Sequence, residues 1–400
     1  MMATPASPHS DGPVELYASV GQRLARYLVD ADDGKLREDA ALELPESVQY
    51  AVHDRARGLL YVACSNGSPG APGDRHWIVA VRLAQRPALE GAPVPLPSRP
   101  IHLSLDGSGR RLLVAYNQAP GLSLHAVAAD GSVSQALAAG LPEGAHYAHQ
   151  VVPMPDGRHV VVVCRGADAH GAAPELPGSL QVLSLEGDAI RAVQAVTPAG
   201  GYGFGPRNIV FNAAGTRAYV SVERQNRLVV YALENGRFGA EPISMQSTLR
   251  GLPSYAPQIA GALRLHPNGQ FLYVANRTHR TTGGDRCPDV GPGENSIAVY
   301  RLDQNSGVPV PLQTIGTEGV HPRTLSLDDA GRLLVAANLR AASFDGPTGV
   351  RQAQAGFAVF RVERDGRLTL LNRHPVSTDH RLLFWSAIVG RDAAVAGHTD

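Results

Sequence analysis

The 400-residue sequence has few of the residues on which several common kinds of site depend. Its three cysteines, Cys64, Cys164 and Cys287, are odd in number and widely separated, which excludes a disulfide framework and a CxxC metal site. Lys35 is the only lysine, so a Schiff-base mechanism has almost no candidate residue. The cysteines are therefore expected to be buried thiols.

Charge and long apolar runs are also scarce. Charged residues make up 18% of the chain, and 36 basic residues balance 36 acidic ones, so no overall field attracts nucleic acid or an anionic membrane. No apolar run approaches the roughly eighteen residues of a membrane span, and residues 1–12 lack a signal-peptide pattern. These absences predict a cytoplasmic protein with neither nucleic acid nor membrane as a partner.

Glycine and proline, by contrast, are abundant. The chain has 43 Gly and 30 Pro, and 44% of its residues are hydrophobic, which indicates a globular protein with many turns. By length alone it could form two or three domains. A repeat narrows this choice: six times, a turn with Asp, Asn or Gly precedes an aliphatic strand such as Leu59–Ser65 or Gln270–Arg277. Intervals of 51, 48, 58, 54 and 62 residues separate the turn glycines Gly58, Gly109, Gly157, Gly215, Gly269 and Gly331.

Each repeat reads as four short antiparallel strands joined by tight turns, with no amphipathic helix between them. About seven such units fit into 400 residues. The pattern predicts an all-β fold, a seven-bladed β-propeller of four-stranded antiparallel blades. Two separate β-sandwiches are the alternative.

The chain ends complete the count of blades. Residues 16–45 read as strands two, three and four of a blade that lacks its first strand, and Leu382–Val389 is an unpaired apolar segment. Pairing of the N- and C-terminal strands would close the ring and leave no free sheet edge. We therefore expect a flexible segment at 1–13, a single propeller domain at 14–390 and a tail at 391–400.

Candidate site residues follow from propeller geometry. The start of the first strand and the end of the second strand of each blade lie on one face, where they surround the central channel. Polar residues occupy many of these positions. At strand-one starts they are His146, His149, Arg207, His321 and Arg323, and at strand-two ends they are Asn66, Asn117, Glu223, Asn276, Arg277 and Asn338.

Long loops gather on the same face. The connections between strands two and three are extended at 66–76, 169–178, 278–294 and 341–356, whereas the turns on the opposite face stay short. Long loops on one face usually carry the function of a scaffold. Surface drift is the alternative explanation, but drift would not favour one type of connection.

Several phrases resemble a known family. Gly205–Glu223 has the form GPRxxxFxxxGxxxYVxxE, and His266–Arg277 and His321–Asn338 follow in the expected order. Together with the histidine of His149–Gly157, these phrases are similar to the seven-bladed propeller lactonases, which include one class of 6-phosphogluconolactonase and a fungal 3-carboxymuconate lactonizing enzyme. The likeness extends roughly from residue 17 to residue 389. Asn208 departs from the histidine that the family often has at this position.

The resemblance implies a catalytic set of His149, Glu223, Arg207 and Arg277. A histidine can take a proton from water at neutral pH, and a nearby carboxylate can orient it or act as the base. Arginines can hold the developing oxyanion or grip an anionic group of the substrate. The predicted substrate-binding residues are Arg323, His321, Asn338, Asn117 and Asn66.

Each of these assignments has a plainer alternative. An arginine at a strand start can bind backbone carbonyls, Glu223 can be merely the ion-pair partner of Arg207, and asparagines at strand ends can satisfy loop backbone groups. We expect no cofactor and no metal. A divalent cation held by Glu223 with Asn66, Asn117 and Asn338 is the alternative, because these side chains offer oxygen ligands.

The resemblance therefore implies a lactonase that opens a small carboxylated or phosphorylated sugar-type lactone, 6-phosphogluconolactonase-like. A small-molecule lactone is then the expected partner. The same four residues would serve a muconate-type lactonizing enzyme, a cycloisomerase, which runs the reverse reaction. A non-catalytic propeller that binds proteins is the third hypothesis; the Gly-His and Trp-Asp repeats of WD40 scaffolds are absent.

Overall fold

The fold is that of a computed structural model, in which residues 14–68, 70–251, 258–278, 286–287, 293–346 and 349–390 are described. Strands dominate it, and two 3₁₀ turns, at Arg55–Arg57 and Pro198–Gly201, are its helical elements over these ranges. In this described part of the chain no helix is long and apolar enough to cross a membrane. The flexible segment predicted at 1–13 and the tail predicted at 391–400 lie outside the described residues.

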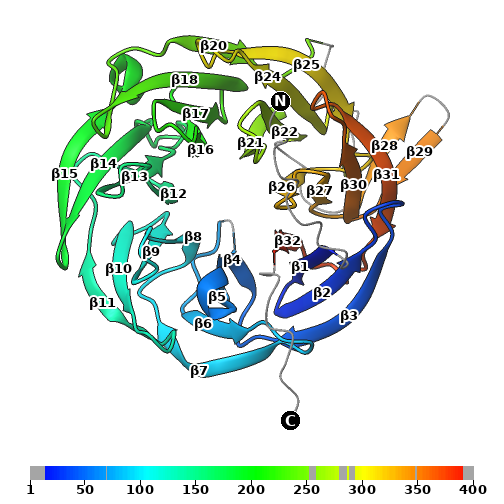
Figure 1. Ribbon diagram of the computed structural model, residues 1–400, viewed down its shortest axis with the longest axis horizontal. Helices are drawn as coiled ribbons and strands as arrows, with labels where there is room; N and C mark the ends of the chain where they lie inside the picture. The colour runs from blue at the N-terminus through cyan, green and yellow to red at the C-terminus, as the bar shows by residue number, and fades with distance from the viewer. Residues whose placement is uncertain are drawn as a thin grey trace, which may run out of the picture.

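Seven antiparallel sheets form a ring, and each sheet is one blade of a propeller (Figure 1). The innermost strands are β32 (Leu383–Val389), β4 (Val48–Asp54), β8 (Pro100–Leu105), β12 (Ala148–Pro153), β16 (Pro206–Phe211), β21 (Gln258–Leu265) and β26 (Pro322–Leu327). The second strands are β1 (Val14–Val20), β5 (Leu59–Ser65), β9 (Arg111–Tyr116), β13 (His159–Cys164), β17 (Arg217–Val222), β22 (Phe271–Thr278) and β27 (Leu333–Asn338). Blades one to seven follow this order, so blade one contains β32 and β1.

The outer half of each blade is equally regular. The third strands are β2 (Arg23–Val29), β6 (His76–Arg82), β10 (Leu122–Val127), β14 (Ser179–Glu186), β18 (Arg227–Glu234), β24 (Ser296–Leu302) and β30 (Gly356–Val362). The outermost are β3 (Leu36–Glu43), β7 (Ala88–Pro95), β11 (Val133–Ala139), β15 (Ala189–Val196), β25 (Pro309–Gly316) and β31 (Leu368–Pro375). In blade five, β19 (Arg237–Phe238) and β20 (Ser244–Ser247) share this position. The predicted seven-bladed propeller is confirmed.

The two ends of the chain meet in blade one. β1 pairs antiparallel with β32, with Glu15 opposite Val389 and Ser19 opposite Trp385. In Figure 1 the red β32 lies beside the blue β1. The predicted closure of the ring is therefore confirmed, and it stabilises the fold because the edge of β1 and the single strand β32 satisfy each other's backbone groups.

The core consists of seven hydrophobic clusters, one at each seam between neighbouring blades. Second strands contribute to two seams at once. In β5, Leu59 and Tyr61 pack toward blade three, whereas Leu60 and Val62 pack toward blade one. Because both faces of such a strand are covered, its sequence is continuously apolar, which explains the aliphatic part of the repeat.

The tyrosines of the repeat link one blade to the next. The hydroxyl of Tyr61 donates to the carbonyl of Gly131 at 2.9 Å, and that of Tyr273 donates to Gly366 at 3.0 Å. Both glycines have positive φ, 90° and 84°, in the turn between strands three and four of the following blade. A side chain there would strain the turn, so the Tyr and the distant turn Gly of the repeat form one structural unit.

A β-bulge interrupts every innermost strand near its start. In β21 it falls at Gly261 and Ala262, and in the other six strands it falls at the second residue. A bulge turns an extra side chain away from the regular ladder and is common beside active sites. The six bulged second residues are Phe384, Gln49, Ile101, His149, Arg207 and Arg323.

The long loops of blades six and seven contain strands of their own. β23 (Arg286–Cys287) pairs parallel with β28 (Ala342–Gly346), which pairs antiparallel with β29 (Gly349–Ala353). This small sheet joins the connections predicted at 278–294 and 341–356. Residues 279–285, 288–292 and 347–348 of these connections lie outside the described residues.

Candidate active site

Glu223 is the centre of a buried charge cluster at the mouth of the channel. It follows β17 directly, and its side chain is only 3% exposed. One carboxylate oxygen accepts hydrogen bonds from Arg207 at 3.0 Å and from Arg277, and the other accepts from Arg165 at 3.2 Å. Three blades, four to six, therefore place a guanidinium group against one carboxylate.

A glycine gives Arg277 room to reach this cluster. At the bulge of β21, a Cβ atom built on Gly261 would lie 3.2 Å from Nε and 3.3 Å from Cδ of Arg277. The carbonyl of Gly261 accepts a hydrogen bond from the Ser221 hydroxyl at 2.9 Å, which holds the bulge in place. Blade six thus has no side chain at position 261 of its innermost strand, and Arg277 from the neighbouring strand β22 occupies that space.

His321 supports Arg277 from the opposite side. Its Nδ1 lies 2.9 Å from the carbonyl of Thr278, and its Nε2 lies 3.2 Å from Nη1 of Arg277. A carbonyl only accepts, so Nδ1 carries the proton and Nε2 accepts from the arginine. Burial, followed by the charge of Arg277, lowers the pKa of His321 well below its ordinary value, in agreement with this neutral form. His321, predicted to bind substrate, therefore lies where it positions Arg277.

The cluster keeps Glu223 ionised. Burial by itself would raise the pKa of this carboxyl, but Arg207, Arg277 and Arg165 outweigh burial and hold the pKa well below its ordinary value. A carboxylate that binds protons so weakly and already accepts three charged hydrogen bonds is a poor general base. The geometry therefore favours Glu223 as the group that orients the arginines.

Burial and mutual repulsion disfavour the charged form of the arginines in the cluster. Burial and the neighbouring charge of Arg277 lower the pKa of Arg207 to about 9, against the stabilising effect of Glu223. Arg207 therefore remains protonated at neutral pH. The single carboxylate thus faces three positive charges, which leaves an excess positive charge to stabilise a developing oxyanion or another anion.

His149 lies beside the cluster without a hydrogen bond to it. It is the bulged residue of β12, and its Nδ1 is buried with no partner among the described residues. Burial, and then the charge of Arg207, lower the pKa of His149 well below 6.5, although Glu223 opposes this. The imidazole is therefore neutral at pH 7 and can accept a proton, although more weakly than a free histidine does.

A second pair of arginines lies on the other arc of the ring. The guanidinium of Arg323 stacks 3.6 Å from the ring centre of Phe384, and its Nε donates to the Phe384 carbonyl at 3.0 Å. Arg99, which precedes β8, lies 5.9 Å from the same ring and donates from Nε to Oε1 of Gln49 at 2.8 Å. Arg323, Phe384, Gln49, His149 and Arg207 all line one small cavity of about 50 Å³ in the channel.

The predicted asparagines have mainly structural contacts. Oδ1 of Asn66 accepts from the backbone nitrogens of Asp74 and Arg75, both at 3.0 Å, so Asn66 organises the loop at 66–76. Oδ1 of Asn117 is buried without a partner among the described residues. Asn117 is therefore the one predicted asparagine of the three whose acceptor is not used by the fold.

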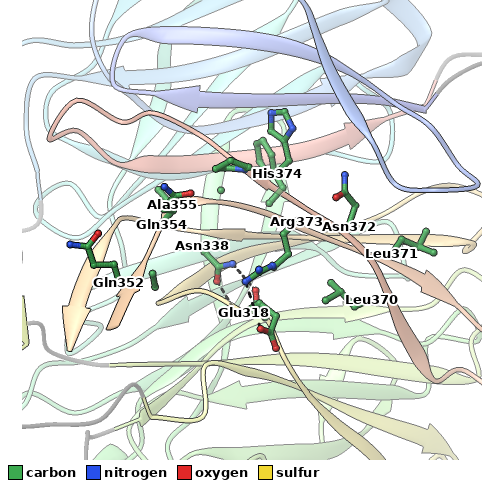
Figure 2. A pocket seen from close by; sticks show the side chains of 15 residues that line it. Glu318, Asn338, Gln352, Gln354, Ala355, Leu370, Leu371, Asn372, Arg373 and His374 are labelled. Carbon is green, nitrogen blue, oxygen red and sulfur yellow. Dashed lines mark hydrogen bonds and ion pairs between the residues drawn. The ribbon is translucent and has the colours of Figure 1, made fainter. Parts of the chain in front are cut away.

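Asn338 lies in a different cavity. Its Nδ2 donates to the Thr317 carbonyl at 2.9 Å, and its Oδ1 accepts from the Thr317 hydroxyl at 2.8 Å. Figure 2 shows it with Glu318 and Arg373, which form a 3.7 Å ion pair, at a pocket of about 770 Å³. None of the residues of the Glu223 cluster lines this pocket, so the structure does not bring Asn338 to the channel.

Most of the oxygen ligands of the alternative cation site already have partners in the fold. Glu223 faces three guanidinium groups, Asn66 is used by its loop and Asn338 by Thr317. Within the part of the chain that the structure describes, no three His, Cys, Asp or Glu side chains gather as metal ligands do. The alternative oxygen-ligand set is thus not assembled in this geometry.

Three residues of the site escaped the sequence analysis. Arg165 follows β13, at a strand-two end, so the rule that selected Glu223 and Arg277 would have found it. Arg99 stands one residue before a strand start, and its contacts are with distant residues. Gly261 is recognisable only from the side chain that approaches it.

The loop at 169–178 is held by hydrogen bonds to residues next to the Glu223 cluster. Glu175 accepts a hydrogen bond from Nη1 of Arg224 at 2.8 Å and one from the Gly203 nitrogen at 2.7 Å. Nη2 of Arg224 donates to the Arg165 carbonyl at 3.1 Å. The connection of blade four is therefore fixed to blade five next to two members of the cluster.

The fold and the cluster place the chain in a family. The family model described as "Lactonase, 7-bladed beta-propeller" matches residues 14–344, so the chain belongs to this family and the sequence-based expectation is confirmed. The alternative fold of two separate β-sandwiches is wrong, because the seven blade sheets form a single ring (Figure 1).

Curated relatives carry a common name. The chain is 27% identical over 255 residues to the 6-phosphogluconolactonase of Formosa agariphila, covering 60% of this chain and 64% of the relative, slightly less than two thirds of its length. It is 26% identical to the 6-phosphogluconolactonase of Pectobacterium carotovorum, covering 79% of this chain and 93% of that protein.

A solved structure agrees in fold. The periplasmic gluconolactonase of Pseudomonas aeruginosa superposes with a TM-score of 0.71 over 91% of this chain and 97% of its own, at 22% identity. At this identity the likeness demonstrates the same propeller, and the chemistry has to be argued from the residues of this chain.

Proposed function

We propose that this protein is a lactone hydrolase that opens a small carboxylated or phosphorylated sugar-type lactone, as a 6-phosphogluconolactonase does. One observation carries the proposal: two arginines, fixed by one buried carboxylate, lie beside an uncharged histidine at the mouth of the channel. Family membership and the names of the relatives support a lactone as substrate.

The reaction begins with the attack of water on the lactone carbonyl. His149 accepts a proton from the water as its oxygen bonds to the carbonyl carbon. The carbonyl oxygen becomes an oxyanion, which Arg207 and Arg277 stabilise with charged hydrogen bonds. When the oxyanion collapses, the ring C–O bond breaks, and the ring oxygen leaves as an alcohol with the proton that His149 returns.

Glu223 acts in this scheme without touching the substrate. Its three hydrogen bonds hold Arg165, Arg207 and Arg277 in one arrangement before the substrate arrives, which lowers the cost of organising the oxyanion site. The scheme needs no metal, because the arginines supply the positive charge. An anionic substrate would offset part of their charge and thereby raise the pKa of His149 toward the value of an effective base.

The test is hydrolysis itself. In a pH-stat, the purified protein is expected to release acid from 6-phosphogluconolactone faster than the spontaneous rate, and aldonolactones and muconolactones complete the panel. His149→Ala, which lacks the proton acceptor, is expected to return the rate to near background. Spontaneous rates with every lactone of the panel would refute the proposal.

The remaining alternatives are read from the same samples. A cycloisomerase would consume a muconate, seen as a loss of its ultraviolet absorbance that disappears in His149→Ala. A binding platform would capture a protein partner and show no calorimetric heat with small lactones. A cytoplasmic location stays a prediction; the Pseudomonas protein of the same fold is described as periplasmic.

A further inference from the structure

Arg99 and Arg323 are two cations that the fold holds without a carboxylate. Nε of Arg99 donates a hydrogen bond to the side-chain oxygen of Gln49, and Nε of Arg323 donates one to the carbonyl of Phe384. Both acceptors are uncharged. Among the described residues, neither guanidinium forms an ion pair, and no hydrogen bond from their terminal nitrogens to the protein is found. Four terminal nitrogens therefore remain for another acceptor.

The electrostatics of the pair call for an anion. Burial lowers the pKa of Arg99 to about 10. Burial also lowers the pKa of Arg323 well below its ordinary value, with the charges of Arg207, Arg277 and Arg99 adding to the effect and only Glu223 opposing it. The π face of Phe384 compensates a cation weakly, by roughly 0.5–2 kcal/mol. A bound anion would relieve both side chains.

The position of the pair matches one end of a small substrate. Arg323 lines the same channel cavity as His149 and Arg207, from the other side. Along the ring, β26, β32, β4 and β8 form one arc and β12, β16 and β21 the other (Figure 1). A ligand with its reacting carbonyl at Arg207 would therefore extend toward Phe384 and the pair.

We propose that Arg323, stacked on Phe384, and Arg99, held by Gln49, form a subsite for the anionic group of the lactone, a phosphate or a carboxylate remote from the reacting carbonyl. The proposal rests on the proposed lactonase function. The arginines then have two separate roles, since those on Glu223 serve the oxyanion and those on Phe384 bind the charged group of the substrate. Planar guanidinium groups suit phosphate and carboxylate alike because both accept two parallel hydrogen bonds.

The experiment measures a ratio. For wild type, Arg99→Gln and Arg99→Lys, kcat/KM is determined with 6-phosphogluconolactone, with a carboxylated lactone and with uncharged gluconolactone. Arg99→Gln is expected to lower the ratio of charged to uncharged kcat/KM by about 10- to 100-fold, the effect of one charged hydrogen-bonding group. Arg99→Lys keeps the charge and is expected to recover part of that loss. The charged lactone whose ratio falls more identifies phosphate or carboxylate as the preferred group.

The matched control is Arg110→Gln. Arg110 is exposed in the turn between β8 and β9, on the opposite face from Arg99, and its side chain has no role in the channel. Its substitution is expected to leave the ratio at the wild-type value. An equal ratio in Arg99→Gln and wild type, or an equal fall in Arg110→Gln, would overturn the subsite.

Phosphate binding provides a readout that does not depend on hydrolysis. Inorganic phosphate is expected to raise the melting temperature of wild type and Arg110→Gln, and to raise that of Arg99→Gln and Arg323→Gln much less. If no lactone is hydrolysed but this difference appears, the lactonase function fails and the anion subsite stands. If lactones are hydrolysed and phosphate stabilises all four proteins equally, the subsite fails and the function stands.

Discussion

The channel mouth contains two groups of arginines that differ in what holds them. On one arc, Arg207 and Arg277 converge on the buried carboxylate of Glu223. On the other, Arg99 and Arg323 lie near the same aromatic ring, and neither forms an ion pair with a carboxylate of the described residues. Both groups consist of arginines at the same end of the channel, so they differ in the group that each arginine contacts.

A carboxylate and an aromatic ring organise a guanidinium group in different ways. Glu223 uses the hydrogen-bonding edges of its arginines, fixes their orientation and offsets part of their charge. Phe384 contacts the flat face of Arg323 and leaves its edge available. The first arrangement suits a preorganised oxyanion site, and the second suits capture of a group that brings its own negative charge.

Removing the carboxylate should have the largest effect. Glu223→Gln leaves the buried guanidinium groups of Arg207 and Arg277, with the partly exposed one of Arg165, without their shared carboxylate, and breaking a buried ion pair from one side costs about 3–5 kcal/mol. We expect the free energy of unfolding in urea to fall by that order and lactone hydrolysis to be lost. Glu186→Gln, which breaks the exposed pair with Arg191, should cost less than about 1 kcal/mol. Equal stability of the two variants would show that the cluster is not held by Glu223.

His149 should matter for the rate and little for the fold. Within the part of the chain that the structure describes, its Nδ1 has no partner, so His149→Ala removes a proton acceptor without breaking a hydrogen bond at that atom. We expect kcat/KM to fall by roughly 10²- to 10⁴-fold, with the melting temperature near that of wild type. His170→Ala, in the exposed loop at 169–178, is the control. A fall of less than tenfold in His149→Ala would assign the base elsewhere.

Arg165 should tune His149 from a distance. A protonated His149 cannot accept a proton, so kcat/KM declines as pH falls through its lowered pKa. Arg165 contributes to that lowering; Arg165→Gln therefore raises the pKa, and the acid limb of the profile moves to higher pH. The measurement is kcat/KM from pH 4 to pH 8, with Arg110→Gln as control. A limb that stays or moves to lower pH contradicts this account of the cluster.

The smallest effect concerns the room left for Arg277. Gly261→Ala adds a methyl group 3.2 Å from Nε of Arg277, which Glu223 and His321 hold in place. A shift of a few tenths of an ångström should lower kcat/KM several-fold, because oxyanion stabilisation depends on position. Gly107→Ala meets nothing within 4 Å and should change neither rate nor stability. Identical kinetics for both would mean that Gly261 has no positioning role.

The repeat made most of the fold predictable. The turn glycines and apolar second strands predicted seven blades, and the unpaired segment that begins at Leu382 predicted the closure of the ring. Both predictions were possible because every blade repeats the same local sequence pattern. Blade five was less regular than expected, with its outer position shared by β19 and β20. The pairing of β23 with β28 joins loops far apart in sequence, and no local pattern encodes it.

Site residues could be predicted where their position in the repeat determines their role, and could not where contacts with distant residues determine it. Position in the repeat selected His149, Arg207, Glu223 and Arg277, and three of these are joined by hydrogen bonds. Position also selected Asn338 and His321, whose contacts are with Thr317 and Arg277 instead of the channel cavity.

The sequence by itself determined the propeller, its closure and the face on which polar residues meet, since these depend on periodic patterns within each blade. Only the tertiary structure decided which arginines share a carboxylate and which do not. Arg207, Arg277 and Glu223 come from different strands, and Arg99 meets Phe384 across 285 positions of the chain. Ion pairing and desolvation act between neighbours in space, and therefore the division of the arginines appears only when the ring is closed.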